Sequence, residues 1–445
     1  MSDGTSSGTR LREAPQFVLA LLAVAVAAAA FAIAFRFTLA AVVEAVAGVG
    51  NHVDAMANAA WWWRLTLPML GGLAAGLVGL VIARRGRGGG VGDVMEAVAL
   101  GGTRLSMSMT LLKSGASWLA IVAGGSLGRE GPLIQFGGTA GQSIGGWLRI
   151  PEPQQRVLIA AGTAAGFAAA YNTPLAAVVF VLEIVTGIIV IETIVPTLVA
   201  TVIATMLTRA AVGAGPIYGH REFVMTSAGE LFAFVAVALA AAVAAVGFKR
   251  LVMAGERAFG QRWLPAPWRS AVGGLGAGAI IVALPQVAGN GFEPLNALLD
   301  GTISIQLVAL LLFAKAFATT SSVASGSPGG VFTPTMLIGG CTGYLAGTAL
   351  LAAGLDVGPP GGYALVGMAA AIAAATHAPL MAAILAFELS GDYAVVLPLV
   401  LATAIATVFA RVLDRDSIYT AELRARGVSW KPVAQRLPQR PSTQT

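Results

Sequence analysis

Two segments of this chain repeat the same spacing of glycine and proline, 202 positions apart. They begin Gly128-Arg129-Glu130-Gly131-Pro132 and Gly330-Val331-Phe332-Thr333-Pro334, and further glycines recur at Gly137, Gly138, Gly141 and at Gly339, Gly340, Gly343. In a membrane chain, apolar segments that glycine and proline interrupt at matching places in two halves indicate a binding site where the halves meet. The repeat therefore constrains both the fold and the position of the site.

The composition predicts a protein that lies mostly within lipid. Of the 445 residues, 57% are hydrophobic and only 11% are charged, with a mean hydropathy of +0.80, whereas a soluble domain carries about 25% charged residues. Apolar runs occur at Phe17–Ala34, Leu65–Ala83, Ile184–Met206, Leu231–Phe248, Ser270–Leu284 and Leu307–Ala318. Since one crossing takes about 20 residues, the chain can form on the order of ten or more embedded helices. We therefore expect an all-α polytopic membrane protein.

A second pair of related blocks supports an internal duplication. Ala168–Ala177 resembles Ala373–Ala382, and each block continues through an apolar run to a glutamate, Glu183 or Glu388, 205 positions apart. We predict a polar tail at 1–16, a first membrane repeat at 17–212, a linker at 213–226, a second repeat at 227–413 and a basic C-terminal segment at 414–445. These patterns leave open whether the repeats are parallel or inverted.

The basic residues predict the orientation of the chain. They cluster before the first apolar run, after the second and after the last, at Arg10, Arg12, Arg84, Arg85, Arg87, Arg411, Arg415, Arg424, Arg426, Lys431, Arg436 and Arg440. Positive flanks favour the cytoplasm, so we expect both termini there. The C-terminal group could also bind anionic lipid, which is compatible with that orientation. A net charge of +6 with this distribution gives no reason to expect a nucleic-acid partner.

Glu130 is the leading candidate for a functional residue. Gly128 and Gly131 allow unusual backbone angles around it, and Pro132 suits the first turn of a helix. The segment thus predicts a helix N-terminus at membrane depth, where free N–H groups and the helix dipole can bind an anion. The simpler alternative is an ion pair of Glu130 with Arg129 or Lys113. We favour function, because an ionisable side chain inside a membrane is costly to keep.

Enzymatic motifs are weak in this chain. The segment from Gly124 to Gly128 matches the G-x-S-x-G pattern of hydrolases around Ser126, but that pattern needs a strand–turn–helix setting and a histidine partner. The three histidines do not suggest a triad, and we expect His377 to cap the helix before Pro379. No metal-ligand, Walker or Rossmann motif is present. We therefore expect no enzyme, no cofactor and no metal, with an embedded hydrolase as the least favoured alternative.

These motifs together resemble the CLC family of chloride channels and anion/proton exchangers. The resemblance rests on Gly128–Pro132, Gly330–Pro334, Tyr171–Leu175, His377–Leu380 and Ile418–Ala421, and it runs from about Gly88 to Arg424. It implies two inverted repeats of tilted and broken helices, assembled as a homodimer with one pathway in each subunit. We expect the prokaryotic type, without a C-terminal cytosolic regulatory domain, because none fits after Arg411.

The resemblance also implies roles for individual residues. Glu130 would be the gate, which occupies an anion site when ionised and leaves it when protonated. The anion would bind backbone N–H groups and one hydroxyl, from Gly89, Gly90, Gly131, Val331, Phe332 and Tyr419. Lys113 and Arg129 would support the site electrostatically. Neutral dipoles can hold an anion tightly enough to select it and weakly enough to release it.

Two positions depart from the family pattern. Gly89 stands where a serine is usual, which removes a hydroxyl donor and leaves the preferred anion open between chloride and nitrate or others. Ile184 stands where exchangers carry a proton-relay acid, and Glu192 has no spacing that would make it a substitute. Proton relays through membranes use ionisable side chains. We therefore favour uncoupled, channel-like conduction of an anion, most simply chloride, with an anion/proton antiporter as the alternative.

Overall fold

The computed structural model describes residues 5–85, 90–101, 103–187, 191–223, 225–227, 229–260 and 264–428, which are almost entirely helical. The helices are α1 (Thr5–Ala47), α2 (His52–Asn58), α3 (Trp61–Arg85), α4 (Val91–Leu100), α5 (Met107–Val122), α6 (Glu130–Trp147), α7 (Glu152–Tyr171), α8 (Pro174–Phe180), the π-helical turn η1 (Val181–Val185), α9 (Ile191–Val212), α10 (Glu230–Gly260), α11 (Ala266–Ala283), the 3-10 turn η2 (Pro285–Val287), α12 (Phe292–Leu299), α13 (Ile305–Ala324), α14 (Phe332–Ala352), α15 (Pro360–Thr376), α16 (Pro379–Ser390), α17 (Val396–Leu413) and α18 (Ile418–Ala425).

The helix lengths confirm a polytopic membrane protein. Within the described ranges, seven stretches are long and apolar enough to cross a membrane, those of α1–α2, α3, α9, α10, α13, α14 and α17–α18. Others are apolar but too short to span, among them α5, α8 with η1, α15 and α16. The apolar run at 184–206 is divided, because η1 ends at Val185 and α9 begins at Ile191. Apolar composition alone therefore does not give the helix bounds.

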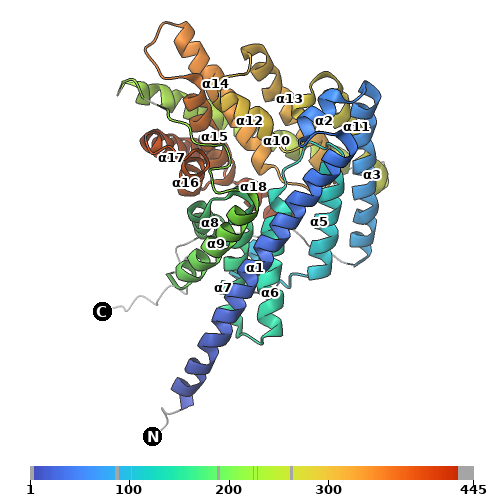
Figure 1. Cartoon of the computed structure of the whole chain (residues 1–445), viewed down its shortest axis with the longest axis vertical. Helices are drawn as coiled ribbons and strands as arrows, with labels where there is room; N and C mark the ends of the chain where they lie inside the picture. Colours follow the sequence, from blue (N-terminus) through green and yellow to red (C-terminus); the bar gives the residue numbers. More distant parts are fainter. Residues whose placement is uncertain are drawn as a thin grey trace, which may run out of the picture.

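The two halves of the chain build the same arrangement twice. In the first half, α6 packs on α7, α7 on α9 and α5 on α6; in the second, α14 packs on α15, α15 on α17 and α13 on α14. The halves also contact each other along α3 and α11, which lie side by side. Figure 1 shows α6–α9 in the lower part of the molecule and α12–α17 in the upper part, with α18 between them. The repeat that the sequence predicts is thus a structural repeat.

Glycines bring the central helices of each repeat into backbone contact. A Cβ added at Gly137 of α6 would overlap the carbonyl of Gly162 in α7, and one at Gly162 would overlap the carbonyl of Gly137. Gly339 of α14 and Gly367 of α15 have the same reciprocal relationship. Since lipid supplies no hydrophobic force between helices, small residues that permit close approach are what hold such pairs together.

The helices α7 and α15 end in the same way. Asn172 and His377 are the C-caps, and both adopt the left-handed conformation, with φ of 58° and 61°. In each case a proline two residues later begins the next helix, α8 or α16. The prediction that His377 caps the helix before Pro379 is confirmed.

Candidate functional site

The two repeated glycine–proline segments meet at the centre of the molecule. The amide of Gly128 donates to the carbonyl of Gly330 at 2.7 Å, and the amide of Gly330 donates to the carbonyl of Gly128 at 2.8 Å. Because the two strands of this bridge run antiparallel, equivalent segments approach each other in opposite directions, as inverted repeats require. Two residues beyond each glycine a helix begins, α6 at Glu130 and α14 at Phe332. The predicted helix start at Glu130 is therefore confirmed.

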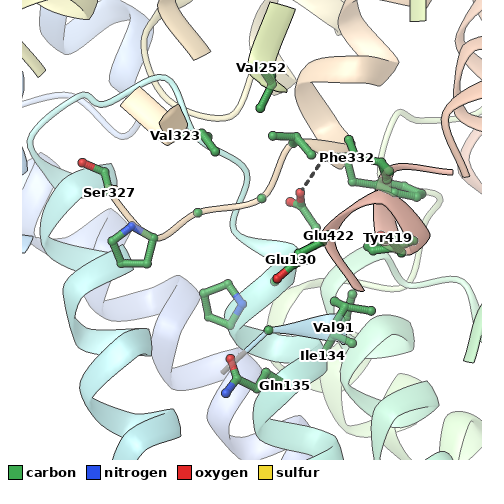
Figure 2. Close-up of a pocket in the computed structure, with 18 of the residues that line it drawn as sticks. Val91, Glu130, Ile134, Gln135, Val252, Val323, Ser327, Phe332, Tyr419 and Glu422 are labelled. Carbon is green, nitrogen blue, oxygen red and sulfur yellow. Dashed lines mark hydrogen bonds between the residues drawn. The ribbon is translucent and has the colours of Figure 1, made fainter. Parts of the chain in front are cut away.

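The side chain of Glu130 binds the beginning of the opposite helix. Its Oε1 accepts a hydrogen bond from the backbone amide of Phe332 at 3.0 Å, and its Oε2 accepts one from the Thr333 hydroxyl at 3.1 Å. Glu130 is only 2% exposed. Figure 2 shows its carboxylate directed at Phe332. Both bonds come from the start of α14, where the helix dipole favours a negative charge. This geometry favours an anion site over a simple ion pair with Arg129 or Lys113.

A cavity of about 460 Å³ brings most of the predicted site residues together. Its walls include Gly90, Lys113, Glu130, Gly131, Val331, Phe332 and Tyr419. Tyr419 comes from α18, and its ring packs edge-on against Phe180 of α8, with ring centroids 6.3 Å apart. Figure 2 shows Tyr419 and Glu422 beside Glu130. The cavity is thus built from both repeats and from α18.

Two described residues of the predicted site, Arg129 and Ile184, do not line this cavity, and a third predicted residue is not described. Gly89 lies outside the described residues. Arg129 is the N-cap of α6 and does not line the cavity, so its electrostatic role stays a prediction. Ile184 is buried in η1, with 4% of its surface exposed, and does not line the cavity either.

Thr333 and Tyr171 are site residues that the sequence analysis missed. The Thr333 hydroxyl binds Glu130, and it also shares a hydrogen bond of 2.9 Å with the Tyr171 hydroxyl. The Tyr171 ring packs against Phe332, with ring centroids 5.6 Å apart. Both residues lie inside the repeated blocks, and Thr333 directly follows Phe332, which was the available signal. A buried chain of hydrogen bonds thus fixes the atoms that hold the Glu130 carboxylate.

The glutamates that follow the Ala168–Ala177 and Ala373–Ala382 blocks each bind backbone amides in the opposite half of the chain. Glu183 accepts hydrogen bonds from the amides of Leu380 and Met381, at 3.2 and 2.8 Å, at the start of α16. Glu388 accepts them from the amides of Leu175 and Ala176, at 3.0 and 2.8 Å, at the start of α8. Each carboxylate therefore satisfies amides that an isolated helix N-terminus would leave without partners. The exchange ties the two repeats together.

Two lysines at equivalent positions have different surroundings. Lys113 of α5 lines the cavity, whereas Lys315 of α13, 202 positions later, is fully buried elsewhere. The Lys315 amine donates to the carbonyls of Val287 and Gly289 at 3.0 and 2.8 Å. The duplication thus preserves the residue type, while only the first lysine borders the cavity.

The structure gives no support to hydrolase chemistry at Ser126. This side chain is fully buried, and its hydroxyl shares a hydrogen bond of 3.0 Å with the hydroxyl of Thr319 rather than with a histidine. Across the described ranges, no three His, Cys, Asp or Glu side chains are grouped so that they could hold a metal ion.

Known proteins resemble this chain over most of its length. Residues 70–411 match the family model described as voltage gated chloride channel. A ClcB-like protein of Ralstonia nicotianae is 40% identical over 85% of this chain and 90% of its own length. The voltage-gated ClC-type chloride channel ClcB of Escherichia coli is 33% identical over 83% of this chain and 89% of its own.

Solved structures share the fold over nearly the whole chain. A slow cyanobacterial Cl⁻/H⁺ antiporter superposes with a TM-score of 0.82 at 25% identity, covering 93% of this chain and 98% of the other. A CLC-type fluoride/proton antiporter superposes with a TM-score of 0.73 at 22% identity, covering 91% and 96%. Because its identity to this chain is so low, the likeness to the fluoride/proton antiporter shows only that the fold is shared.

Proposed function

Because the chain belongs to the CLC family of voltage-gated chloride channels, a family of transporters and channels rather than enzymes, we propose that it conducts chloride through a pathway that Glu130 gates. The observation that carries this proposal is the Glu130 carboxylate bound at the N-terminus of α14, inside the cavity. The transported anion is the only ligand that this function requires.

The gate works by competition between two negative charges for one site. The Phe332 amide and the Thr333 hydroxyl now hold the carboxylate. A chloride ion can take its place, because both donors suit any small anion and the dipole of α14 favours negative charge. Protonation of Glu130 removes its charge and weakens its hold on these donors. The site is then open to an anion from the cavity.

We propose that this conduction is uncoupled from proton movement. Ile184 cannot carry a proton, and it is buried in η1, away from the cavity. The second candidate is exchange of an anion for a proton. It is favoured by the likeness to a structure described as a Cl⁻/H⁺ antiporter, which matches almost the whole chain.

A flux assay in sealed vesicles separates these candidates. Purified protein is reconstituted into liposomes loaded with chloride, and external chloride and pH are recorded together. Chloride efflux under a potassium–valinomycin shunt, without proton movement, is the expected result. Proton uptake driven by a chloride gradient would replace uncoupled conduction with exchange. An absence of any anion flux would refute the transport proposal as a whole.

We further propose a homodimer with both termini on the cytoplasmic side. The basic residues at both ends support this orientation, through the preference of Lys and Arg for the cytoplasmic flank, and the family resemblance supports the dimer. Light scattering in detergent should give a protein mass twice that of the 44.9 kDa chain. Protease added to right-side-out vesicles should leave a C-terminal tag intact. A monomer mass or a cleaved tag would contradict these two points separately.

A further inference from the structure

Arg426 joins two helices that border the same part of the cavity. Its guanidinium pairs with the carboxylate of Asp93, in the first turn of α4, and with that of Glu422, one turn earlier in α18. Asp93 and Arg426 are 333 positions apart. The Asp93 side chain is only 7% exposed and that of Arg426 is 36% exposed, so the pair is half-buried. A planar guanidinium can engage two carboxylates at once, which a lysine cannot do with the same geometry.

The first turn of α4 lies directly on α18. A Cβ added at Gly90 would be 3.4 Å from Oε1 of Glu422, and one added at Gly92 would be 3.4 Å from a methyl carbon of Leu423. The start of α4 and the end of α18 thus lie within van der Waals reach of each other, where the Asp93–Arg426 pair joins them. Gly90 and Glu422 both line the cavity. The position of α18 against α4 thus defines one side of the space that an anion would cross.

Polar contacts attach α18 at both of its ends. It has eight residues, and an isolated helix shorter than about 12 residues is unstable in water. Before its start, the buried Lys249 of α10 pairs with Asp414 at 2.8 Å and donates to the carbonyl of Asp416. At its end, the Arg426 pair attaches it to α4. Tyr419, the α18 residue that we expect to donate its hydroxyl to the anion, lies between these two attachments.

We propose that the Asp93–Arg426 ion pair is a latch that fixes α18 against α4 and so determines which anions the pathway prefers. Arg426 is then a positioning residue for Tyr419 and for the backbone that begins at Gly90. A binding site must hold its groups within about 0.5 Å to discriminate between similar ligands. Chloride and nitrate differ in size and shape, so a change in this spacing changes their relative transport. The inference rests on the proposed anion transport but not on the choice between conduction and exchange.

If Arg426 acted only through its charge, the two single variants would have opposite effects on anion flux. If Arg426 only attracted anions, Arg426→Gln would lower the flux of every anion, and Asp93→Asn, which removes a negative charge, would raise it. A latch is broken by either change, so both variants shift the chloride-to-nitrate ratio in the same direction. Both variants leave the other charged groups on this cavity unchanged, namely Lys113, Glu130, Lys249, Glu256 and Glu422.

The experiment measures the ratio of chloride to nitrate flux in vesicles for wild type, Asp93→Asn, Arg426→Gln and the double variant. We expect each single variant to lower the ratio about threefold or more and the double variant to fall no further, because coupled neighbours are not additive. Arg424→Gln is the matched control. It removes the same charge from the same helix, but from an exposed side chain that pairs with Asp416, and it should leave the ratio unchanged.

Further outcomes decide the remaining cases. Arg426→Lys keeps the charge and should still lower the ratio, and together with Asp93→Asn it decides the question if Arg426→Gln does not fold. Shifts of opposite sign in the two single variants, an additive double variant, or an equal effect of Arg424→Gln would overturn the latch. A wild-type protein without anion flux would reject the proposed function itself. Normal flux with an unchanged ratio in both single variants would reject only the latch.

Discussion

Replacing Glu130 with glutamine tests the gate most directly. The substitution keeps the shape of the side chain but removes the charge that the Phe332 amide and the Thr333 hydroxyl bind, at 3.0 and 3.1 Å. A hydrogen bond to a charged group contributes about 1.5–3 kcal/mol, against about 0.5–1.5 kcal/mol for a neutral pair. The substitution therefore weakens the two bonds together by roughly 2–3 kcal/mol. This difference corresponds to a roughly 30- to 150-fold gain in affinity for an anion that competes with the side chain for the site.

Two measurements follow from this difference. In detergent, calorimetric titration with chloride should show tighter binding to Glu130→Gln than to wild type, up to the factor above. In vesicles, wild-type flux should rise as pH falls, because protonation releases the gate, whereas the variant should be fast and insensitive to pH. Glu152→Gln is the control, since it removes a carboxylate from an exposed ion pair with Arg156 at the start of α7. Equal chloride affinity and an unchanged pH profile in Glu130→Gln would refute the competition between carboxylate and anion.

Three further predictions address the gate, the cross-repeat caps and the anion preference. Gly330→Ala should raise anion flux at neutral pH, because the added methyl group would overlap the Glu130 carboxylate. Gly247→Ala is its control, since Gly247 has open space around it. Equal flux in the two variants would contradict the role of Glu130 as the gate. Glu183→Gln and Glu388→Gln should each lower the free energy of unfolding by about 1–2 kcal/mol, since each loses a charged cap on two amides. Thermal melts in detergent should show similar falls in the unfolding midpoint for both variants and no fall for Glu192→Gln, which changes an exposed side chain. Gly89→Ser should raise the chloride-to-nitrate flux ratio by adding a hydroxyl donor, and an unmoved ratio would mean that this position does not border the anion.

Several features of the site could be predicted from local sequence. The break at Gly128–Pro132 predicted a helix that begins beside Glu130, and α6 begins at that residue. The second copy predicted that Val331 and Phe332 would lie at the same site, and both line the cavity with Glu130. These predictions succeeded because glycine, proline and a buried charge impose their constraints within a few residues, and because duplication repeats the constraint.

Other features could not be predicted, because they depend on residues far apart in the chain. Tyr171 meets Thr333 across 162 positions, and no local pattern links a tyrosine at the end of α7 to a threonine in α14. The repeated blocks identified Glu183 and Glu388 as equivalent, but not that each caps a helix of the opposite repeat. Arg426 was counted only as part of a basic tail, although it binds Asp93 at the start of α4.

The sequence by itself determined the environment of this protein and its internal duplication, and it singled out the residue that we propose as the gate, since composition and the spacing of glycine, proline and charge act locally. Only the tertiary structure decided what the Glu130 carboxylate binds, which glutamates join the two repeats, and that Arg426 joins the end of α18 to α4. The physical reason is that an apolar helix can pack on many others with similar energy, whereas a buried carboxylate must find specific donors, and those donors are supplied by the other repeat.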